Sequence, residues 1–480
     1  MIFSRRFLPC NLISPGFRSL LAILLFFAVC AYGEAQTDFY WEQPNRFSSG
    51  PGKFPVSDFG RDLSVIVWQE TSPNNRADIA GDSQIHISLG VKSAGEDWKT
   101  YRNVGGPYYY SGEEPAILNV AVDNRGRIII AAAASVTETE ILISSDRGES
   151  FSGSRLDSGS ESSIAPRIAV RADGGYLLFI TRGYEESLSI YYSRSDDGVV
   201  WSPFGLFVQS QGLQLNFLPA HAAMGSTDYV VFQSFVGGAD IIPAFQLYMQ
   251  TSTNGGRSWN PPRRITDFRD PLMNTGSDAD RFDNQRSHLS VYGNSLFLVW
   301  ERRFGTGSPQ IYGALLNSQG TASDVERINT DEAYCNNPVG FIYRGIRTAV
   351  WFDNRSGSSR IYLGRRDPVG WSNYDLSGGS GDASFGRPLI DGNDLLILWQ
   401  VITRGMGYIY TVLPDTTVTP PRLAAQNFSP SRRTRGERAR VLWSPPFDTS
   451  GIEGYSWLWS RSPVEEPSRR ISVYPAANVS

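Results

Sequence analysis

Arginine and carboxylate residues follow several of the apolar runs in this chain. Glu301 and Arg302 come directly after the run that ends at Trp300, and Asp353 and Arg355 follow a similar run. A guanidinium fork matches an anionic group with two parallel hydrogen bonds, and a carboxylate beside it is suited to acid–base work. Because the pattern recurs and a reaction needs one asymmetric site, we interpret Asp353 and Glu301 first as braces of a hairpin.

A second pattern has the form of a short polar turn that ends in an aromatic residue. Residues 144–151 read Ser-Ser-Asp-Arg-Gly-Glu-Ser-Phe, and related copies occur at 194–201 and 252–259. A carboxylate or amide can accept hydrogen bonds from N–H groups of its own turn, glycine permits a positive φ, and the ring can pack between layers. We therefore interpret the following residues as structural rather than catalytic or calcium-binding: Ser144, Asp146, Gly148, Phe151, Asp196, Gly198, Trp201, Ser252, Asn254, Gly256 and Trp259.

Both patterns belong to a repeat that extends from about residue 53 to 412. An apolar run is followed ten or eleven residues later by an Ile-Tyr pair, as between Trp351 and Tyr362. A proline at the first residue of a strand loses no ladder hydrogen bond. We therefore expect one strand of each unit to open at the following residues: Pro55, Pro115, Pro166, Pro219, Ser287, Pro338 and Pro388.

Seven such units, roughly 50 to 70 residues apart, exceed the size of one sandwich domain. A radial array suits them, because it leaves only short strand edges exposed. The sequence therefore predicts an all-β fold, a β-propeller over residues 37–413. Seven blades are expected, with six or eight as alternatives, and residues 39–44 are the candidate outer strand that closes the last blade.

The turn pattern, in register with this repeat, resembles the Asp-box, or bacterial neuraminidase repeat, of the sialidase superfamily of propellers. The resemblance covers roughly residues 40 to 412 and implies that these turns lie away from the ligand face. Sialidases clamp a substrate carboxylate with three arginines and use a tyrosine nucleophile with a glutamate, and an aspartate as acid/base. Here the stretch that opens the first blade, residues 52–55, reads Gly-Lys-Phe-Pro without the arginine of the family motif. No catalytic residue is therefore assigned.

In a propeller, the loops before each innermost strand and those between the second and third strands meet on one face near the axis. Arg286 and Arg387 occupy such positions without counterparts in other units, so they are the first candidates for ligand contact. Tyr334 is the first tyrosine to test if the protein is an enzyme. The candidate ligand-binding residues are Arg286, Arg387, Arg182, Glu114, Glu301, Arg302, Asp353 and Arg355.

Composition excludes several classes of function. The 480 residues are 41% hydrophobic and carry a formal net charge of -4, which suits a folded core and argues against an electrostatic nucleic-acid binder. Three cysteines and three histidines are too few for a disulfide scaffold or a histidine-rich metal centre. We expect no metal and no cofactor, and we interpret His86, His221 and His288 as structural.

Residues 1–36 have the order of an export signal, with arginines before the apolar run 20–29 and small residues after it. The run is shorter than a membrane-spanning helix requires. We expect an exported protein, in the periplasm, at the cell surface or secreted, without a transmembrane helix in the mature chain. Lipid attachment at Cys30 is the alternative, although Val29 fits such a signal poorly.

The repeat stops near residue 413, and a separate tail follows. Residues 414–421 are a linker rich in proline and threonine, and residues 422–480 resemble the first half of a fibronectin type III-like module. A complete module of this kind needs about 90–100 residues. We therefore expect the sequence to end inside a domain.

The leading interpretation is an exported, sialidase-like propeller that binds a glycan or an extracellular protein as a module of a larger cell-envelope protein. It is expected to be monomeric. The alternatives are an exo-sialidase or related glycoside hydrolase, and a propeller with a purely structural role in assembly. A triad of arginines with a nearby tyrosine and glutamate would favour the hydrolase.

Overall fold

The computed structural model describes residues 41–73, 82–111, 115–159, 163–184, 187–211, 214–238, 241–266, 282–379, 381–391, 394–415, 422–425 and 441–444. The predicted export signal, residue Glu114 and most of the predicted C-terminal module lie outside this part of the chain. Residues 42–413 form one compact unit. In the second unit, the described strands β29 (Arg422–Ala425) and β30 (Val441–Ser444) pair antiparallel.

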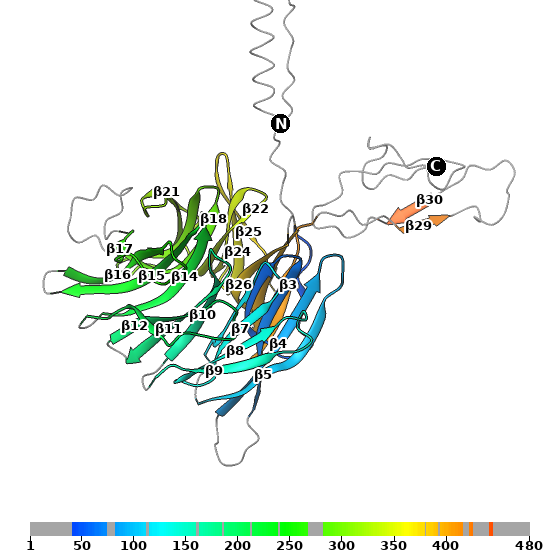
Figure 1. Ribbon diagram of the computed structural model, residues 1–480. Helices are drawn as coiled ribbons and strands as arrows, with labels where there is room; N and C mark the ends of the chain where they lie inside the picture. Colours follow the sequence, from blue (N-terminus) through cyan, green and yellow to red (C-terminus); the bar gives the residue numbers. More distant parts are fainter. Residues whose placement is uncertain are drawn as a thin grey trace, which may run out of the picture. The chain divides into compact units, whose positions relative to one another are not determined.

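The compact unit consists of seven four-stranded antiparallel sheets (Figure 1). The first three are β2 (Lys53–Gly60), β3 (Leu63–Pro73), β4 (Asp82–Ser93) and β5 (Lys99–Ser111); β6 (Leu118–Val122), β7 (Ile128–Ala133), β8 (Glu138–Ser144) and β9 (Ser152–Asp157); and β10 (Ser163–Val170), β11 (Tyr176–Tyr184), β12 (Ser187–Ser195) and β13 (Gly205–Val208). The next two are β14 (Asn216–Met224), β15 (Thr227–Gly238), β16 (Ile241–Ser252) and β17 (Arg263–Arg264); and β18 (Phe282–Tyr292), β19 (Ser295–Phe304), β20 (Gln310–Leu316) and β21 (Ala322–Arg327). The last two are β22 (Cys335–Tyr343), β23 (Ile346–Asp353), β24 (Arg360–Asp367) and β25 (Gly370–Asp375); and β26 (Asp382–Asp391), β27 (Asp394–Thr403), β28 (Met406–Val412) and β1 (Asn45–Arg46).

The first strand of each blade contacts the first strand of the next, and β26 contacts β2, so these seven innermost strands form a closed ring. The predicted seven-bladed β-propeller is therefore confirmed. The last blade takes its outer strand from the start of the unit, where Asn45 and Arg46 pair with Thr411 and Tyr410. This pairing lies just beyond the predicted stretch 39–44, of which the Glu42 N–H donates to the Leu413 carbonyl at 2.9 Å.

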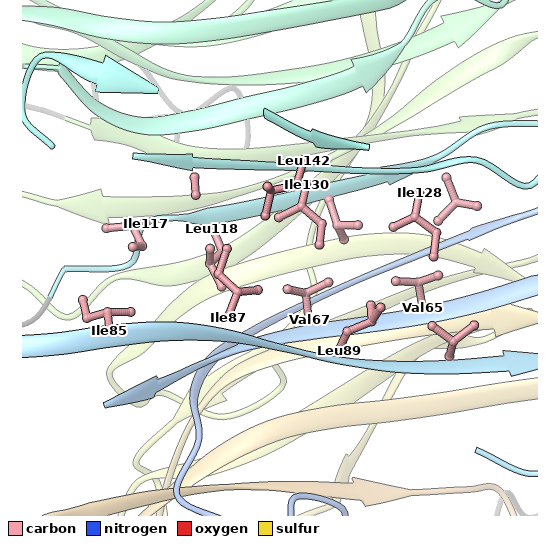
Figure 2. Packing of buried hydrophobic residues seen from close by; sticks show 14 of the residues in the cluster. Val65, Val67, Ile85, Ile87, Leu89, Ile117, Leu118, Ile128, Ile130 and Leu142 are labelled. Atoms are coloured by element: carbon pink, nitrogen blue, oxygen red, sulfur yellow. The ribbon is translucent and has the colours of Figure 1, made fainter. Parts of the chain in front are cut away.

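Each blade buries apolar side chains on both faces because a neighbouring blade covers each face. On β3, Val65 and Val67 pack with Ile130 of the second blade, as Figure 2 shows. The intervening residues Ile66 and Trp68 pack against the last blade instead. This two-sided burial explains why the second strands read as unbroken apolar runs rather than as alternating patterns.

The prolines predicted to open the innermost strands lie within them or, at Pro115, just before β6. Strand β2 begins before Pro55, β14 before Pro219 and β22 before Pro338. The ladder register shifts at each of these positions, and also in β10, β18 and β26. A β-bulge leaves a residue without a ladder partner, so it tolerates proline as well as a strand's first residue does.

Candidate functional site

The innermost strands surround a central cavity of about 760 Å³, to which all seven contribute. That volume falls within the range of small-molecule pockets. The side chains that line it are positioned by the recurring bulges. The cavity therefore joins the seven blades into one asymmetric site, although the blades themselves repeat.

Five bulge residues share a left-handed backbone conformation, which is uncommon for residues other than glycine. All five line the cavity, and we call them the bulge ring: Phe54 (φ 50°), Leu218 (53°), Arg286 (49°), Asn337 (52°) and Phe385 (57°). The rings of Phe54 and Phe385 meet edge to face, with centroids 4.9 Å apart. The bulge ring thus combines an apolar sector with polar side chains.

A second set of residues accepts backbone hydrogen bonds from three of these bulge residues and from Ile117, which lies just before β6. Each acceptor lies on the second strand of the preceding blade, directly after an aromatic residue. The pairs are Gln400 with the Phe54 N–H (2.8 Å), Gln69 with Ile117 (2.8 Å), Gln233 with Arg286 (2.8 Å) and Glu301 with Asn337 (2.7 Å). Glu301 therefore braces two neighbouring blades, rather than the hairpin of which it is part.

Glu301 is the one acid among these four acceptors, and it also neutralises a candidate arginine. Its second carboxylate oxygen receives Arg286 Nη1 at 2.8 Å. The Glu301 side chain is buried, and burial raises its pKa against the lowering effect of Arg286. The charge of Arg286 is thus already compensated within the protein.

Three basic side chains occupy the same register position on their innermost strands, directly after the bulge. Arg167, His288 and Arg387 are each the first ladder-paired residue after the bulge, opposite Phe179, Val299 and Leu398. All three line the cavity, and we call them the basic tier. In the other bulged blades the same position holds Val56, Ala220 and Val339.

The basic tier has no acid to balance it in the described part of the chain. Arg387 Nη1 donates to the Gly386 carbonyl at 2.9 Å, and neither Arg387 nor Arg167 forms an ion pair with a described residue. Burial lowers the pKa of Arg387 to about 10, to which the charge of Arg167 contributes. Burial also lowers the pKa of His288 to about 4, with both arginines adding to the effect, so this imidazole is neutral at pH 7.

Asp58 is the sole acid among the described residues that line the cavity. It lies two residues beyond Val56 on β2, and its Oδ2 accepts the Val122 N–H at 2.7 Å. Burial raises the pKa of Asp58 to about 6. His221, a further lining residue, hydrogen-bonds Asp228 through Nε2 at 3.0 Å.

The remaining candidates that the structure describes lie outside the cavity lining. Arg182 stacks on the ring of Tyr191 at 4.5 Å, and Arg302 covers the ring of Phe282 at 4.1 Å. Tyr334 is partly exposed and meets Phe352 edge to face. Of the predicted candidates in the described part of the chain, the structure brings Arg286 and Arg387 alone to the cavity.

Asp353 braces its own blade. It is fully buried and accepts hydrogen bonds from Trp351 Nε1 at 3.0 Å, from the Cys335 thiol at 3.3 Å and from Arg355. Burial opposes ionisation, but the bonds from Arg355 and Trp351 hold the pKa of Asp353 below its ordinary value. Arg355 also pairs with the exposed Asp331 at 2.6 Å.

The three polar turns are closed by their own side chains. Ser144 accepts the Gly148 N–H at 2.8 Å, and Asp146 accepts the Ser150 N–H at 3.0 Å. The bonds from Ser150 and Ser144 lower the pKa of Asp146 to about 2. The third turn repeats this pattern with Ser252 and Asn254.

The second turn corrects the predicted alignment. Its acceptor for turn N–H groups is Asp197, which bonds Val199 and Val200 at 2.8 Å, rather than Asp196. Ser195 accepts the Gly198 N–H, so this loop is one residue tighter than the other two. Asp196 instead receives the guanidinium of Arg171.

Sequence reasoning missed Arg167 and Asp58. Arg167 adjoins Pro166 as Arg387 adjoins Pro388, so proximity to the strand prolines was the available signal. No group of three or more residues suited to a metal ion occurs in the part of the chain that the structure describes. No described helix is long and apolar enough to cross a membrane.

No family model matches the chain, and no curated protein matches it. Among solved structures, it is similar to the polysaccharide lyase Uly1, at 10% identity and a TM-score of 0.51, over 80% of this chain and 94% of that one. It is also similar to an ulvan lyase of polysaccharide lyase family PL25, at 12% identity and a TM-score of 0.51, over 78% and 95%. An α-L-arabinanase from Penicillium chrysogenum has 14% identity and a TM-score of 0.43, over 62% and 92%. The chain thus shares the fold of the two lyases, a seven-bladed β-propeller.

Proposed function

We propose that this protein binds a saccharide in the central cavity of its propeller. The observation that carries the proposal is the composition of the bulge ring, in which Phe54 and Phe385 offer an aromatic surface and Asn337 offers hydrogen bonds. A cavity lined by apolar rings with a few placed polar groups suits a ligand whose surface is itself mixed. The likeness in fold to polysaccharide lyases is consistent with this class of ligand.

Saccharide binding is tested by a glycan array, followed by calorimetry with the tightest ligand. Phe54→Ala and Phe385→Ala are each expected to weaken binding at least about fivefold, since an aromatic contact contributes about 1 kcal/mol beyond its buried area. Phe304→Ala is the matched control, because this exposed ring lies outside the cavity lining. Equal affinity in all three variants would place the ligand elsewhere.

Hydrolysis is the alternative outcome of the same work. Release of a fluorescent aglycone from a sialoside, abolished by Arg387→Ala, would replace the binding module with an exo-sialidase. The turns at Ser144 and Ser252 share one hydrogen-bond pattern, and this pattern is the feature that favours kinship with the sialidase superfamily. The export signal in residues 1–36 and a role in a larger envelope protein complete the proposal, and mass spectrometry of the native N-terminus tests the signal.

A further inference from the structure

The basic tier and the bulge ring differ in how their charges are compensated. In the bulge ring, Arg286 is held by the buried carboxylate of Glu301 at 2.8 Å. In the basic tier, Arg167 and Arg387 line the same cavity without an ion pair to any described residue. Both side chains are half-buried. A cation that is partly withdrawn from water and has no acidic partner is unfavourable for folding, so two such cations at equivalent positions favour a compensating ligand.

We propose that the saccharide bound in this cavity carries a carboxylate or sulfate group, and that Arg167, His288 and Arg387 receive that group. This inference rests on the proposed function and names the class of its ligand. The three residues share one register position in the third, fifth and seventh blades, so they approach the axis at one level from three sides. An oxyanion at that level meets two guanidinium groups and one imidazole.

The charge distribution favours an anion here. The whole chain has a formal net charge of -4, yet the described lining of the cavity holds two arginines without an ion pair, Arg167 and Arg387, and one aspartate, Asp58. Asp58 hydrogen-bonds the Val122 N–H and lies two residues beyond the tier on β2. Low dielectric strengthens the attraction between the arginines and an anion inside the ring.

His288 adds a neutral polar group to the site. Its Nδ1 is buried and has no hydrogen-bond partner in the described structure. Burial and the two arginines keep the imidazole uncharged at neutral pH, while a hydrogen bond with the Gly340 backbone acts in the opposite direction. A neutral imidazole has one N–H, so His288 donates to the anion in the tautomer that carries its proton on Nδ1 and adds no third cation. Two planar forks and one neutral donor suit an oxyanion with several acceptor oxygens.

The experiment compares matched ligands on the purified full chain by calorimetry. The probes are a uronate-containing oligosaccharide, its carboxyl-reduced neutral counterpart, a sulfated oligosaccharide and inorganic sulfate. The charged sugars are expected to bind about tenfold to hundredfold more tightly than the neutral one, the range of a hydrogen bond to a charged group. The uronate and sulfate arms identify which of the two anionic groups is preferred.

Arg167→Gln and Arg387→Gln are expected to reduce the ratio of charged-sugar affinity to neutral-sugar affinity toward one. Arg387→Lys, which keeps the charge but loses the fork, is expected to retain part of the preference. Arg155→Gln is the matched control, because this exposed arginine lies on outer strand β9 and pairs with Glu138. Circular dichroism of each variant establishes that it is folded.

The outcomes separate the inference from the proposed function. Equal binding of neutral and charged sugars would overturn the inference and leave saccharide binding intact. If no sugar binds but inorganic sulfate binds and is lost in Arg387→Gln, the anion site stands and the saccharide proposal fails. Charged-sugar preference that persists in both glutamine variants would also overturn the inference.

Discussion

The polar turns and the central cavity differ in how their polar and charged side chains are partnered. In the turn at 144–151, Ser144 and Asp146 bond each other and the N–H groups of the loop that they close. In the cavity, Arg167 and Arg387 have no acid beside them among the described residues. The turn is complete without any other molecule, whereas the basic tier is complete only with an anion.

This difference separates structure from function more clearly than residue type does. Asp146, Asp353 and Glu301 are all carboxylates in repeated units, and each is occupied by donors of the protein itself. The cavity, in contrast, contains the cations Arg167 and Arg387 without acidic partners among the described residues, next to residues with left-handed backbone conformation. Strain and uncompensated charge reduce the stability of the fold, so they are found mainly where a functional site retains them.

The largest expected effect concerns a buried carboxylate whose hydrogen-bond donors all belong to the protein. Asp353→Ala should lower the free energy of unfolding by about 3–5 kcal/mol, because it leaves Arg355, Trp351 and Cys335 without their shared buried acceptor. Asp331→Ala removes only the exposed partner of Arg355 and should cost less than about 1 kcal/mol. Urea denaturation measures both, and similar losses would show that burial does not decide the effect.

The basic tier should respond in the opposite direction. Burial lowers the pKa of Arg387 to about 10, so the folded state disfavours the charged form at every pH below that value. Arg387→Gln should therefore raise the free energy of unfolding at pH 7 by up to about 3 kcal/mol while it weakens anion binding. Thermal melting without ligand tests this, and a variant that melts lower would mean that the cation is paired in the protein.

Two groups in the cavity should change the free energy of unfolding in opposite directions as the pH falls. Asp58 has its pKa raised to about 6, so its contribution falls as pH rises from about 4 to 6. His288 has its pKa lowered to about 4, so its contribution falls as pH drops from about 6.5 to 4. The two slopes offset each other in the native protein, and Glu301, whose pKa is also raised, acts in the direction of Asp58.

Single variants should separate the contributions of Asp58 and His288 to the pH dependence of stability. Asp58→Asn should leave a protein that loses up to about 3 kcal/mol between pH 6.5 and 4, and His288→Gln one that gains stability over the same interval. Urea unfolding at several pH values measures the slopes. Parallel profiles for both variants would contradict the assignment of either group.

The sequence predicted the propeller because a propeller repeats. Seven apolar runs with their following hairpins are visible along the chain, and each blade buries both faces of its second strand. The polar turns were predictable for a similar reason, since their partners lie within four residues. Asp196 was misassigned because a loop shorter by one residue moves its role to Asp197, which spacing alone did not reveal.

The site was less accessible to prediction because it depends on register across blades. Arg387 was a candidate, but Arg167 and Asp58 were not, since only a bulge brings Arg167 to the level of Arg387. Glu301 and Arg302 adjoin in sequence, yet one braces a neighbouring blade and the other covers an aromatic ring. A strand alternates its faces, so neighbours in sequence lie in different environments.

The smallest expected effect completes the comparison at the turns. Ser144→Ala removes the hydroxyl that accepts the Gly148 N–H, and the buried amide is left without a partner, so the free energy of unfolding should fall by about 1–2 kcal/mol. Ser145→Ala is the matched control, because this neighbouring hydroxyl is exposed and should change stability little. Urea denaturation and calorimetry with the charged sugar are both needed, because the turn should affect folding and leave affinity unchanged. A loss of affinity in folded Ser144→Ala protein would extend the ligand site to the turns and undo their separation from the cavity.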